Sequence, residues 1–304
     1  MLKFKAIFSS LLLFSFIFSL SGCKLIMLDP KGMIAMDEKN IMIISVLLML
    51  IVVIPVIFLS LYFAYRYRES NSKAVYTPNW SHSTLLEIIC WTVPCLIIIV
   101  LGTITWTSSH RLDPYKPIAA NDKTITIQAI ALEWKWLFIY PEQNIATINY
   151  VQFPVNVPIQ FLITSEGPMN SFHLPQIAGQ IYAMSGMQTK LHLMANALGD
   201  YRGISSNFSG NGFYGMKFTA HVGTQHEFDT WVKSIKLASH PLTLSSYEKL
   251  IKPTENSPIQ LFSPVHTDLF DTVMMKYMMP MDAPKELADD KKNSHSKNNH
   301  SKVA

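Results

Sequence analysis

The sequence contains little charge. Asp, Glu, Lys and Arg account for 15% of its 304 residues, and the formal net charge is only +4. Lysine is densest in the final stretch, "DDKKNSHSKNNHSKVA", which has no apolar residue before the last two. Nucleic-acid-binding domains carry a clustered basic surface, whereas a polar end of this kind is typical of a solvated tail. We therefore expect no nucleic-acid partner and a disordered tail at 288–304.

Cysteine is also scarce, with three residues in the chain. Cys90 and Cys95 both fall inside one long apolar run, where they are most simply interpreted as small packing residues. This number and placement exclude the disulfide framework of a small exported domain. The sequence also lacks internal repeats and a phosphate-binding glycine loop.

The N-terminus has the order of an export signal. Two lysines precede an apolar run that is shorter than a membrane span, and small residues follow before Cys23. The ending "LSGC" resembles the lipobox of bacterial lipoproteins. That resemblance implies that residues 1–22 are removed and that Cys23 becomes an acylated, palmitate-bearing N-terminus. The alternative is a first transmembrane helix with an incidental cysteine.

Long apolar runs are concentrated in the first third of the chain. Residues 41–65 carry no charge, and 85–106 carry a single acid, so each is long enough to cross a bilayer core of about 30 Å. Together they predict a transmembrane hairpin over 41–110. Their connection holds Arg66, Arg68 and Lys73 against one acid, which places it in the cytoplasm. The segment 23–40 and everything after the hairpin then lie on the exported side.

From residue 115 the sequence changes to short β-rich runs separated by Pro, Gly and Asn. "KTITIQAIAL" and "VNVPIQFLIT" alternate apolar and polar residues, as strands do. Several such runs without intervening amphipathic helices predict an antiparallel β-sandwich or barrel over 115–222. Thr224 and Glu227 then form a capping-box pattern, and we expect helices in 223–287, with further helical pieces near 247–250 and 268–278.

Three segments carry a resemblance to a known family. They are "LLEIICWTVPCLII", "ALEWKWLFIYPEQNIATIN" and "MNSFHLPQIAGQIYAMSGMQTKLHL". Because these segments follow one another in this order after a lipoprotein signal, the chain resembles subunit II of haem-copper respiratory oxidases. The resemblance covers nearly the whole mature chain and implies a cupredoxin-like fold for the β-domain. The alternative is an unrelated β-domain with ordinary turn serines.

The family's copper-binding loop is the point at which the sequence departs from that pattern. Cytochrome c oxidases of the family hold a binuclear copper centre with an upstream histidine and the loop C-x-E-x-C-x-x-x-H-x-x-M. When that loop is aligned with "SSNFSGNGFYGM", only the methionine is retained. The corresponding positions are Asn170 for the upstream histidine, Ser205 and Ser209 for the cysteines, Asn207 for the glutamate, Phe213 for the histidine and Met216 for the methionine.

Serine cannot replace cysteine in such a centre, because a neutral hydroxyl is a hard donor and supplies no bridging thiolate. Within the family this loss is typical of quinol oxidases, and the bo-type ubiquinol oxidases are the most similar. The resemblance implies a chain with no metal, no redox centre and no catalytic residue of its own. Haems and copper are expected in a partner subunit I, and ubiquinol is expected to act at the level of the complex.

The implied setting is a bacterial inner membrane, with a multi-pass, lipid-anchored chain and a large periplasmic C-terminal domain. Its partners are the bilayer, subunit I and other oxidase subunits of a proton-pumping complex that reduces oxygen to water. Two alternatives stay open. One is a membrane-anchored periplasmic copper-handling lipoprotein, and the other is a cytochrome c oxidase subunit with an aberrant copper site.

Glu87 is the acid inside the second apolar run. Carboxylates inside membranes are costly and often functional, and the resemblance implies a role for Glu87 in proton uptake from the cytoplasm into subunit I. The structural alternative is a capping box formed by Thr84 and Glu87 at the start of the helix.

Overall fold

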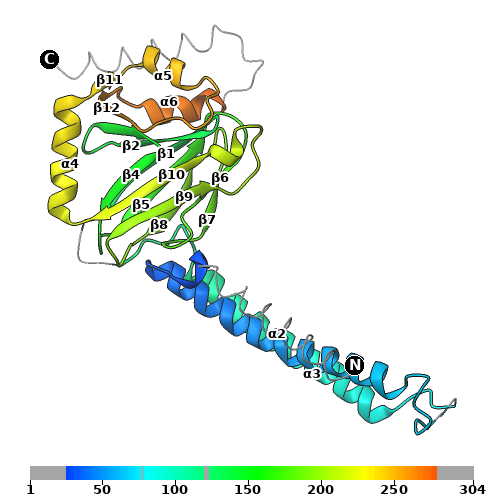
Figure 1. Ribbon diagram of the computed structural model, residues 1–304. Helices are drawn as coiled ribbons and strands as arrows, with labels where there is room; N and C mark the ends of the chain where they lie inside the picture. The colour runs from blue at the N-terminus through cyan, green and yellow to red at the C-terminus, as the bar shows by residue number, and fades with distance from the viewer. Residues whose placement is uncertain (1–24, 76, 78, 120–122, 279–304) are drawn as a thin grey trace, which may run out of the picture. The chain divides into compact units, whose positions relative to one another are not determined.

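The computed structural model describes residues 25–75, 77, 79–119 and 123–278 (Figure 1). The signal sequence 1–22, Cys23 and the tail 288–304 therefore lie outside the described residues. The chain forms two compact units. One contains the residues up to Asp113 together with Pro175–Gly179, and the other contains Pro114–Leu174 and the residues from Gln180 onward.

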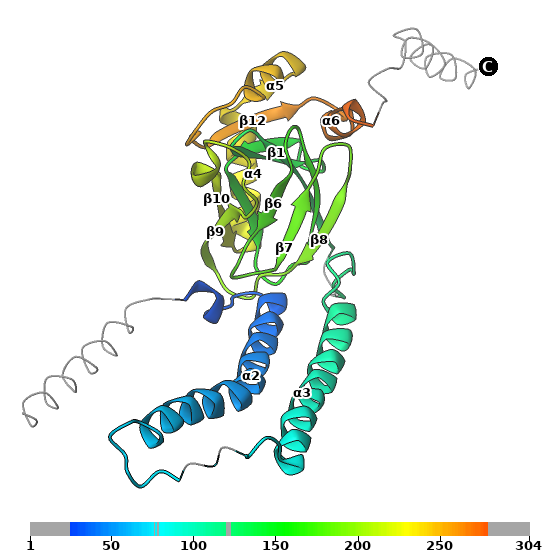
Figure 2. The same ribbon diagram turned by 90° about the vertical axis from the view of Figure 1, so that its right-hand side faces the viewer.

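The first unit is a hairpin of two long helices. A short 3₁₀ turn, η2 (Ile26–Leu28), precedes α2 (Met33–Arg66), and a connecting turn leads to α3 (Thr84–Arg111). Both helices are long and apolar enough to cross a membrane. Figure 2 shows the turn that joins them. The predicted two-helix hairpin is confirmed.

The second unit is a β-sandwich. One sheet has the order β11-β12-β3-β2-β1-β5-β8, and the other has the order β4-β10-β9-β6-β7. The strands that precede the first helix of this unit are β1 (Ile125–Leu132), β2 (Lys135–Tyr140), β3 (Ile145–Ile148), β4 (Tyr150–Pro154), β5 (Ile159–Ser165), β6 (Asn170–His173), β7 (Gln180–Ala183), β8 (Thr189–Leu193), β9 (Gly199–Ser205) and β10 (Lys217–Gly223).

Strand pairing in the sandwich is mixed, and the expectation of a wholly antiparallel one was wrong in this respect. β1 pairs in parallel with β5, β4 with β10, and β11 with β12. The reason lies in the connections. After β3 the chain crosses to the second sheet for β4, and it returns for β5 in the same direction as β1. Pairings of this kind depend on crossovers and cannot be deduced from alternation along one strand.

Aromatic side chains fill the space between the two sheets. Trp136 and Phe138 of β2, Phe172 of β6 and Phe218 of β10 are buried. The Phe172 and Phe218 rings stack with centroids 5.0 Å apart, and Trp136 meets Phe172 edge-on at 5.3 Å. Edge-on and stacked pairs at these distances add to the stabilisation from apolar burial. This core fixes β6, β9 and β10, the strands from which the candidate site is built.

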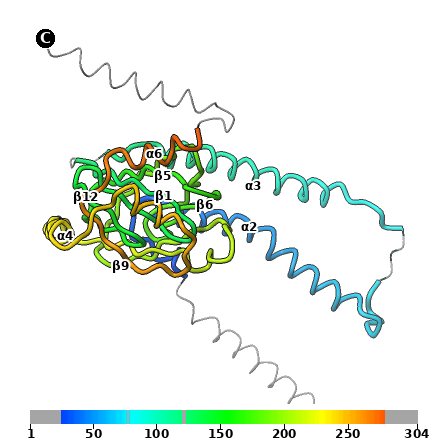
Figure 3. Tube along the Cα trace, turned by 90° about the horizontal axis from the view of Figure 1, so that it is seen from above, coloured from blue at the N-terminus to red at the C-terminus, as the bar shows by residue number. Residues whose placement is uncertain are grey.

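The C-terminal region continues the sandwich. α4 (Gln225–Ala238) starts with the predicted capping box, because Thr224 Oγ1 accepts from Glu227 N while the Glu227 carboxylate accepts from Thr224 N. α4 runs along one end of the sandwich (Figures 1 and 3). The elements that follow are β11 (His240–Leu242), α5 (Leu244–Leu250), β12 (Gln260–Val265) and α6 (Leu269–Lys276).

The sequence predicted a helical region over 223–287, and this was wrong in part because the region also contains two strands. β12 pairs antiparallel with β3 and carries β11 on its other edge, so the larger sheet grows by two strands. Both strands contain proline, Pro241 and Pro264, which weakens any strand pattern in the sequence. Leu242 of β11, Tyr247 of α5 and Phe270 of α6 are buried in a second apolar cluster with residues of β1, β2 and β3.

Candidate functional site: the 205–216 loop and its supports

The loop over 205–216 connects β9 to β10. It begins at the last residue of β9 and passes through a short 3₁₀ turn, η3 (Phe213–Gly215), before β10 starts at Lys217. β6 is the other neighbour of β9, and Phe172 lies opposite Ser205 in that pairing. The first residue of β6 is Asn170. Strand pairing therefore brings the two ends of the predicted site together.

Ser205 and Asn170 are bonded to each other. The Ser205 hydroxyl lies 3.1 Å from Asn170 Oδ1, and the two residues are only 5% and 1% exposed. The Asn170 amide donates to the carbonyl of Pro168 at 3.0 Å, and the Ser205 backbone N–H donates to the carbonyl of Met216 at 3.1 Å. Met216 is buried beside them. Three of the six predicted positions thus meet in a closed hydrogen-bonded cluster.

The remaining predicted positions are held differently. Asn207 donates from its side chain to the carbonyl of Met169 at 2.9 Å. Phe213 packs edge-on against Phe208, with ring centroids 5.6 Å apart, and Phe208 itself is 75% exposed. The Ser209 hydroxyl is buried and has no hydrogen-bond partner among the described residues. Phe213 and Asn207 therefore stabilise the loop through contacts of their own.

Trp134 packs against the loop, and its indole ring leaves no room for a side chain at nearby loop positions. Its indole N–H donates to the carbonyl of Ser209 at 3.1 Å. A Cβ at Gly212 would clash with the indole ring, and Gly210 has a φ of +111°, a conformation that side chains disfavour. Trp134 itself has a φ of +62°. The glycine content of the loop follows from this close approach to the indole.

His173 is separate from the Asn170–Ser205 pair. It is three residues from Asn170 in β6, so the two side chains point to opposite faces of the sheet. Its Nδ1 lies 2.9 Å from the Ser206 hydroxyl, and burial lowers the pKa of the imidazole. The structure therefore does not bring His173 to the position that the family's histidine ligand would need.

The donors at this site do not fit a binuclear copper centre. The loop and Asn170 supply hydroxyl, amide and thioether groups, with no thiolate and no imidazole. Copper centres of this kind require soft thiolate and imidazole ligands. Within the part of the chain that the structure describes, no group of three or more His, Cys, Asp or Glu side chains could hold a metal ion.

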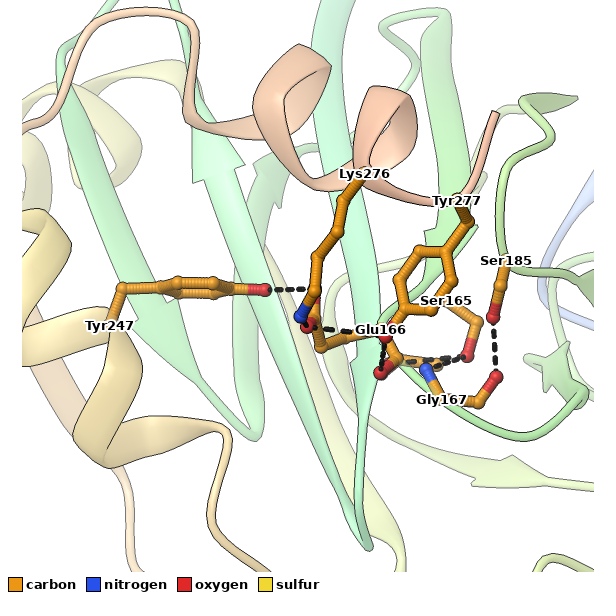
Figure 4. A network of polar contacts seen from close by, with 8 residues as sticks. Ser165, Glu166, Gly167, Ser185, Tyr247, Lys276 and Tyr277 are labelled. Carbon is orange, nitrogen blue, oxygen red and sulfur yellow. Dashed lines mark hydrogen bonds and ion pairs between the residues drawn. The ribbon is translucent and has the colours of Figure 1, made fainter. Parts of the chain in front are cut away.

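A buried carboxylate supports the segment that leads into Asn170. The Glu166 side chain is only 2% exposed, accepts a hydrogen bond from the Tyr247 hydroxyl at 2.9 Å and is paired with Lys276 (Figure 4). The Tyr277 hydroxyl donates to the Glu166 carbonyl at 2.8 Å. Because Tyr247 belongs to α5 and Lys276 to α6, one residue fastens both helices to the end of β5.

The charges in this network have consistent effects on proton affinity. Burial raises the pKa of the Tyr247 phenol, and the neighbouring Glu166 carboxylate raises it further. The hydrogen bond to Glu166 raises the pKa of the Lys276 ammonium group, although that side chain is half exposed and its pairing is screened by solvent. The phenol therefore stays neutral and acts as a donor to the carboxylate.

A buried lysine provides a second attachment for the C-terminal region. Lys135 is 2% exposed, and its ammonium group donates to the carbonyl of Lys252 at 2.8 Å and to the Thr254 hydroxyl. Burial lowers its pKa, an effect that nearby Glu133 partly offsets. A Cβ at Gly215 would lie 2.5 Å from Asn256 Oδ1, so this segment rests against η3. Sequence reasoning had not identified Glu166 or Lys135, because their partners lie far away along the chain.

Glu87 lies in the first turn of α3. The N-cap residue is Ser83, no side chain caps the helix, and the Glu87 carboxylate lies 3.4 Å from His82 Nδ1. The predicted capping box of Thr84 and Glu87 was therefore wrong. Thr84 is the first residue of α3 and already has helical geometry. It therefore cannot occupy the N-cap position, which belongs to Ser83.

Comparison with known proteins identifies the family. The model of the COX Aromatic Rich Motif matches residues 236–281, the region that contains α5, β12 and α6. The chain is 52% identical over 258 residues to cytochrome bo(3) ubiquinol oxidase subunit 2 of Pseudomonas putida, covering 85% of this chain and 82% of that protein. This chain belongs to the ubiquinol oxidase subunit 2 family. It is also 49% identical over 260 residues to ubiquinol oxidase subunit 2 of Acetobacter aceti, covering 85% of this chain and 84% of that one.

Among solved structures, the β-domain is similar to the periplasmic domain of subunit II of cytochrome oxidase from Bradyrhizobium japonicum. The identity is 23%, the match covers 39% of this chain and 96% of that one, and the TM-score is 0.37. Membership of the subunit 2 family favours the oxidase-subunit prediction over a copper-handling lipoprotein, and it overturns the alternative of an unrelated β-domain.

We expect the neutral substitution Glu166→Gln to loosen the C-terminal helices. Hydrogen bonds to a charged group stabilise a fold by about 1.5–3 kcal/mol. Losing that charge should raise the exchange rate of the α5 and α6 backbone amides about tenfold or more. Hydrogen exchange read by mass spectrometry measures this. Glu248→Gln, an exposed change on α5, is the matched control. Equal protection in wild type and Glu166→Gln would contradict the role of this network.

Proposed function

We propose that this chain is the non-catalytic subunit II of a proton-pumping terminal ubiquinol oxidase, which reduces oxygen to water in an aerobic respiratory chain. The chain carries no redox centre in this proposal, and haems and copper belong to the partner subunit I. Its helices brace subunit I in the membrane, and its sandwich covers that subunit on the exported side. The identity of 52% over most of the chain carries the proposal.

The state of the 205–216 loop supports the quinol oxidase over a cytochrome c oxidase. We propose that Asn170, Ser205, Asn207, Ser209, Phe213 and Met216 occupy the positions of a former copper site. The hydrogen bond between Ser205 and Asn170 and the packing of Phe213 on Phe208 fill this region with side-chain contacts. A complex that receives electrons from ubiquinol has no need of copper at this point.

We further propose the arrangement in the membrane. The hairpin crosses a bacterial inner membrane twice, with the α2–α3 turn in the cytoplasm and the sandwich in the periplasm. The excess of basic residues in the turn supports this orientation. Removal of residues 1–22 and acylation of Cys23, with palmitate among its acyl chains, would add an anchor in the outer leaflet of the same membrane.

Purification through this subunit in a mild detergent tests the proposal. An oxidase subunit should bring a larger haem protein with it, because the cofactors of the complex lie in subunit I. The measurement is a visible absorption spectrum of the purified material together with its subunit composition. A chain that is purified alone, without haem, from cells respiring with oxygen would contradict the proposal.

For Glu87 we propose a role in proton uptake from the cytoplasm. Its carboxylate is exposed in this chain and pairs only with His82 among the described residues. Glu87→Gln should lower oxidase turnover severalfold while the complex still assembles, because an amide cannot carry a proton. Turnover and proton pumping are measured in the purified complex.

The control for this experiment is His82→Gln, which removes the pairing and leaves the carboxylate in place. Proton uptake through Glu87 predicts normal turnover in this control. If the two variants lose activity equally, the pairing and not the carboxylate is what matters. If Glu87→Gln turns over and pumps normally, Glu87 takes no part in proton uptake.

A further inference from the structure

The end of α2 and the turn that follows it line a cavity that is open to the surroundings and that the proposed function does not use. Its volume is about 810 Å³, within the range of small-molecule sites. Phe63 and Tyr67 line it from the end of α2, and Arg68, Asn71 and Trp80 line it from the turn. The cavity therefore combines apolar walls with a small number of polar groups.

Asn71 holds the first part of this turn, over residues 66–73. Its side-chain amide donates to the carbonyl of Arg66 at 2.5 Å, and its side-chain oxygen accepts from the backbone of Lys73 at 3.3 Å. Its own backbone N–H donates to the carbonyl of Arg68 at 2.9 Å. These bonds close the end of α2 and hold Arg68 at the wall of the cavity.

Positive charge in the turn is left without compensation. Arg66, Arg68 and Lys73 face a single acid, Glu69, in residues 66–86. None of the ion pairs found in the described part of the chain includes any of these three cations. Arg68 donates from Nε to the Ser70 hydroxyl at 3.0 Å and lies 4.2 Å from the centre of the Tyr65 ring. These contacts orient the guanidinium group without neutralising it.

The turn also has the composition of a membrane interface. It joins two helices whose apolar side chains are exposed along their length, and Tyr65, Tyr67 and Trp80 surround the basic residues. Tyrosine and tryptophan favour the headgroup level of a bilayer, and basic side chains at the cytoplasmic surface attract anionic lipids.

We propose that this cavity binds the headgroup of an anionic phospholipid from the cytoplasmic leaflet. The phosphate would accept from the Arg68 guanidinium group and the Asn71 amide, and the glycerol and first methylene groups would lie against Phe63 and Trp80. A free phosphate ion would use only the polar half of the cavity, so a lipid fits its lining better. The inference rests on the membrane orientation proposed above and does not depend on the oxidase activity.

Native mass spectrometry of the full-length protein, released from detergent with whatever partners it retains, tests this inference. Phosphatidylglycerol and phosphatidylcholine are titrated in parallel, and the bound lipid is counted at each concentration. We expect tight retention of phosphatidylglycerol only. Arg68→Gln should weaken it about tenfold or more, since a charge-assisted hydrogen bond is lost. Arg66→Gln is the matched control, because Arg66 has the same charge but does not line the cavity, and it should weaken binding by no more than about fivefold.

Three results would overturn the inference. Equal loss of phosphatidylglycerol in Arg66→Gln and Arg68→Gln would show that diffuse charge attracts the lipid. Equal retention of phosphatidylcholine would remove the selectivity for an anionic headgroup. Displacement of the lipid by excess inorganic phosphate would make a free anion the ligand. Each result can be obtained whether or not haem accompanies the chain, so failure here is distinguishable from failure of the proposed function.

Discussion

Buried polar groups need hydrogen-bond partners, and this requirement accounts for how Asn170 and Ser205 are held beside the 205–216 loop. Asn170 and Ser205 lie between the aromatic core and the loop, where water does not reach them, and each provides a partner for the other. The Asn170 side-chain amide donates to the carbonyl of Pro168, and the Ser205 backbone N–H donates to the carbonyl of Met216. The same requirement accounts for Trp134, whose indole N–H binds the loop carbonyl at Ser209. In our proposal, side-chain contacts now hold this loop in place. In relatives that bind copper, the metal ligands do so.

The C-terminal region adds a second layer of support. Two buried charges of opposite sign, Glu166 and Lys135, connect it to the rest of the sandwich. Neither charge could be buried alone, because an unpaired buried ion is costly. Glu166 is stabilised by Tyr247 and Lys276, and Lys135 is stabilised by the carbonyl of Lys252 and by the Thr254 hydroxyl. The region that matches the COX Aromatic Rich Motif is thus an integral part of the sandwich, since β12 extends the sheet.

Features that depend on local sequence were predictable, and those that depend on distant contacts were not. The hairpin follows from two apolar runs, and the start of α4 follows from the capping box of Thr224 and Glu227. The proximity of Asn170 and Ser205 was implied by the family's spacing. β11 and β12 were missed because both contain proline and β11 is only three residues long. Glu166 was missed because "TSEGP" has the composition of a turn, and its partners lie 81 and 110 residues away. At α3, the capping pattern failed because the helix begins at Thr84 itself.

The central claim is that this oxidase subunit has a former copper site that is now held by its own side chains. Copper binding by the full-length chain, produced without its partner subunits, tests that claim most directly. The chain is incubated with copper in detergent, freed of unbound metal by gel filtration, and analysed for copper per chain and for thiolate-to-copper absorption. The account predicts no tightly held copper and no such absorption. Stoichiometric copper that stays with the unmodified chain and requires Ser205, Ser209 or Met216 would contradict it.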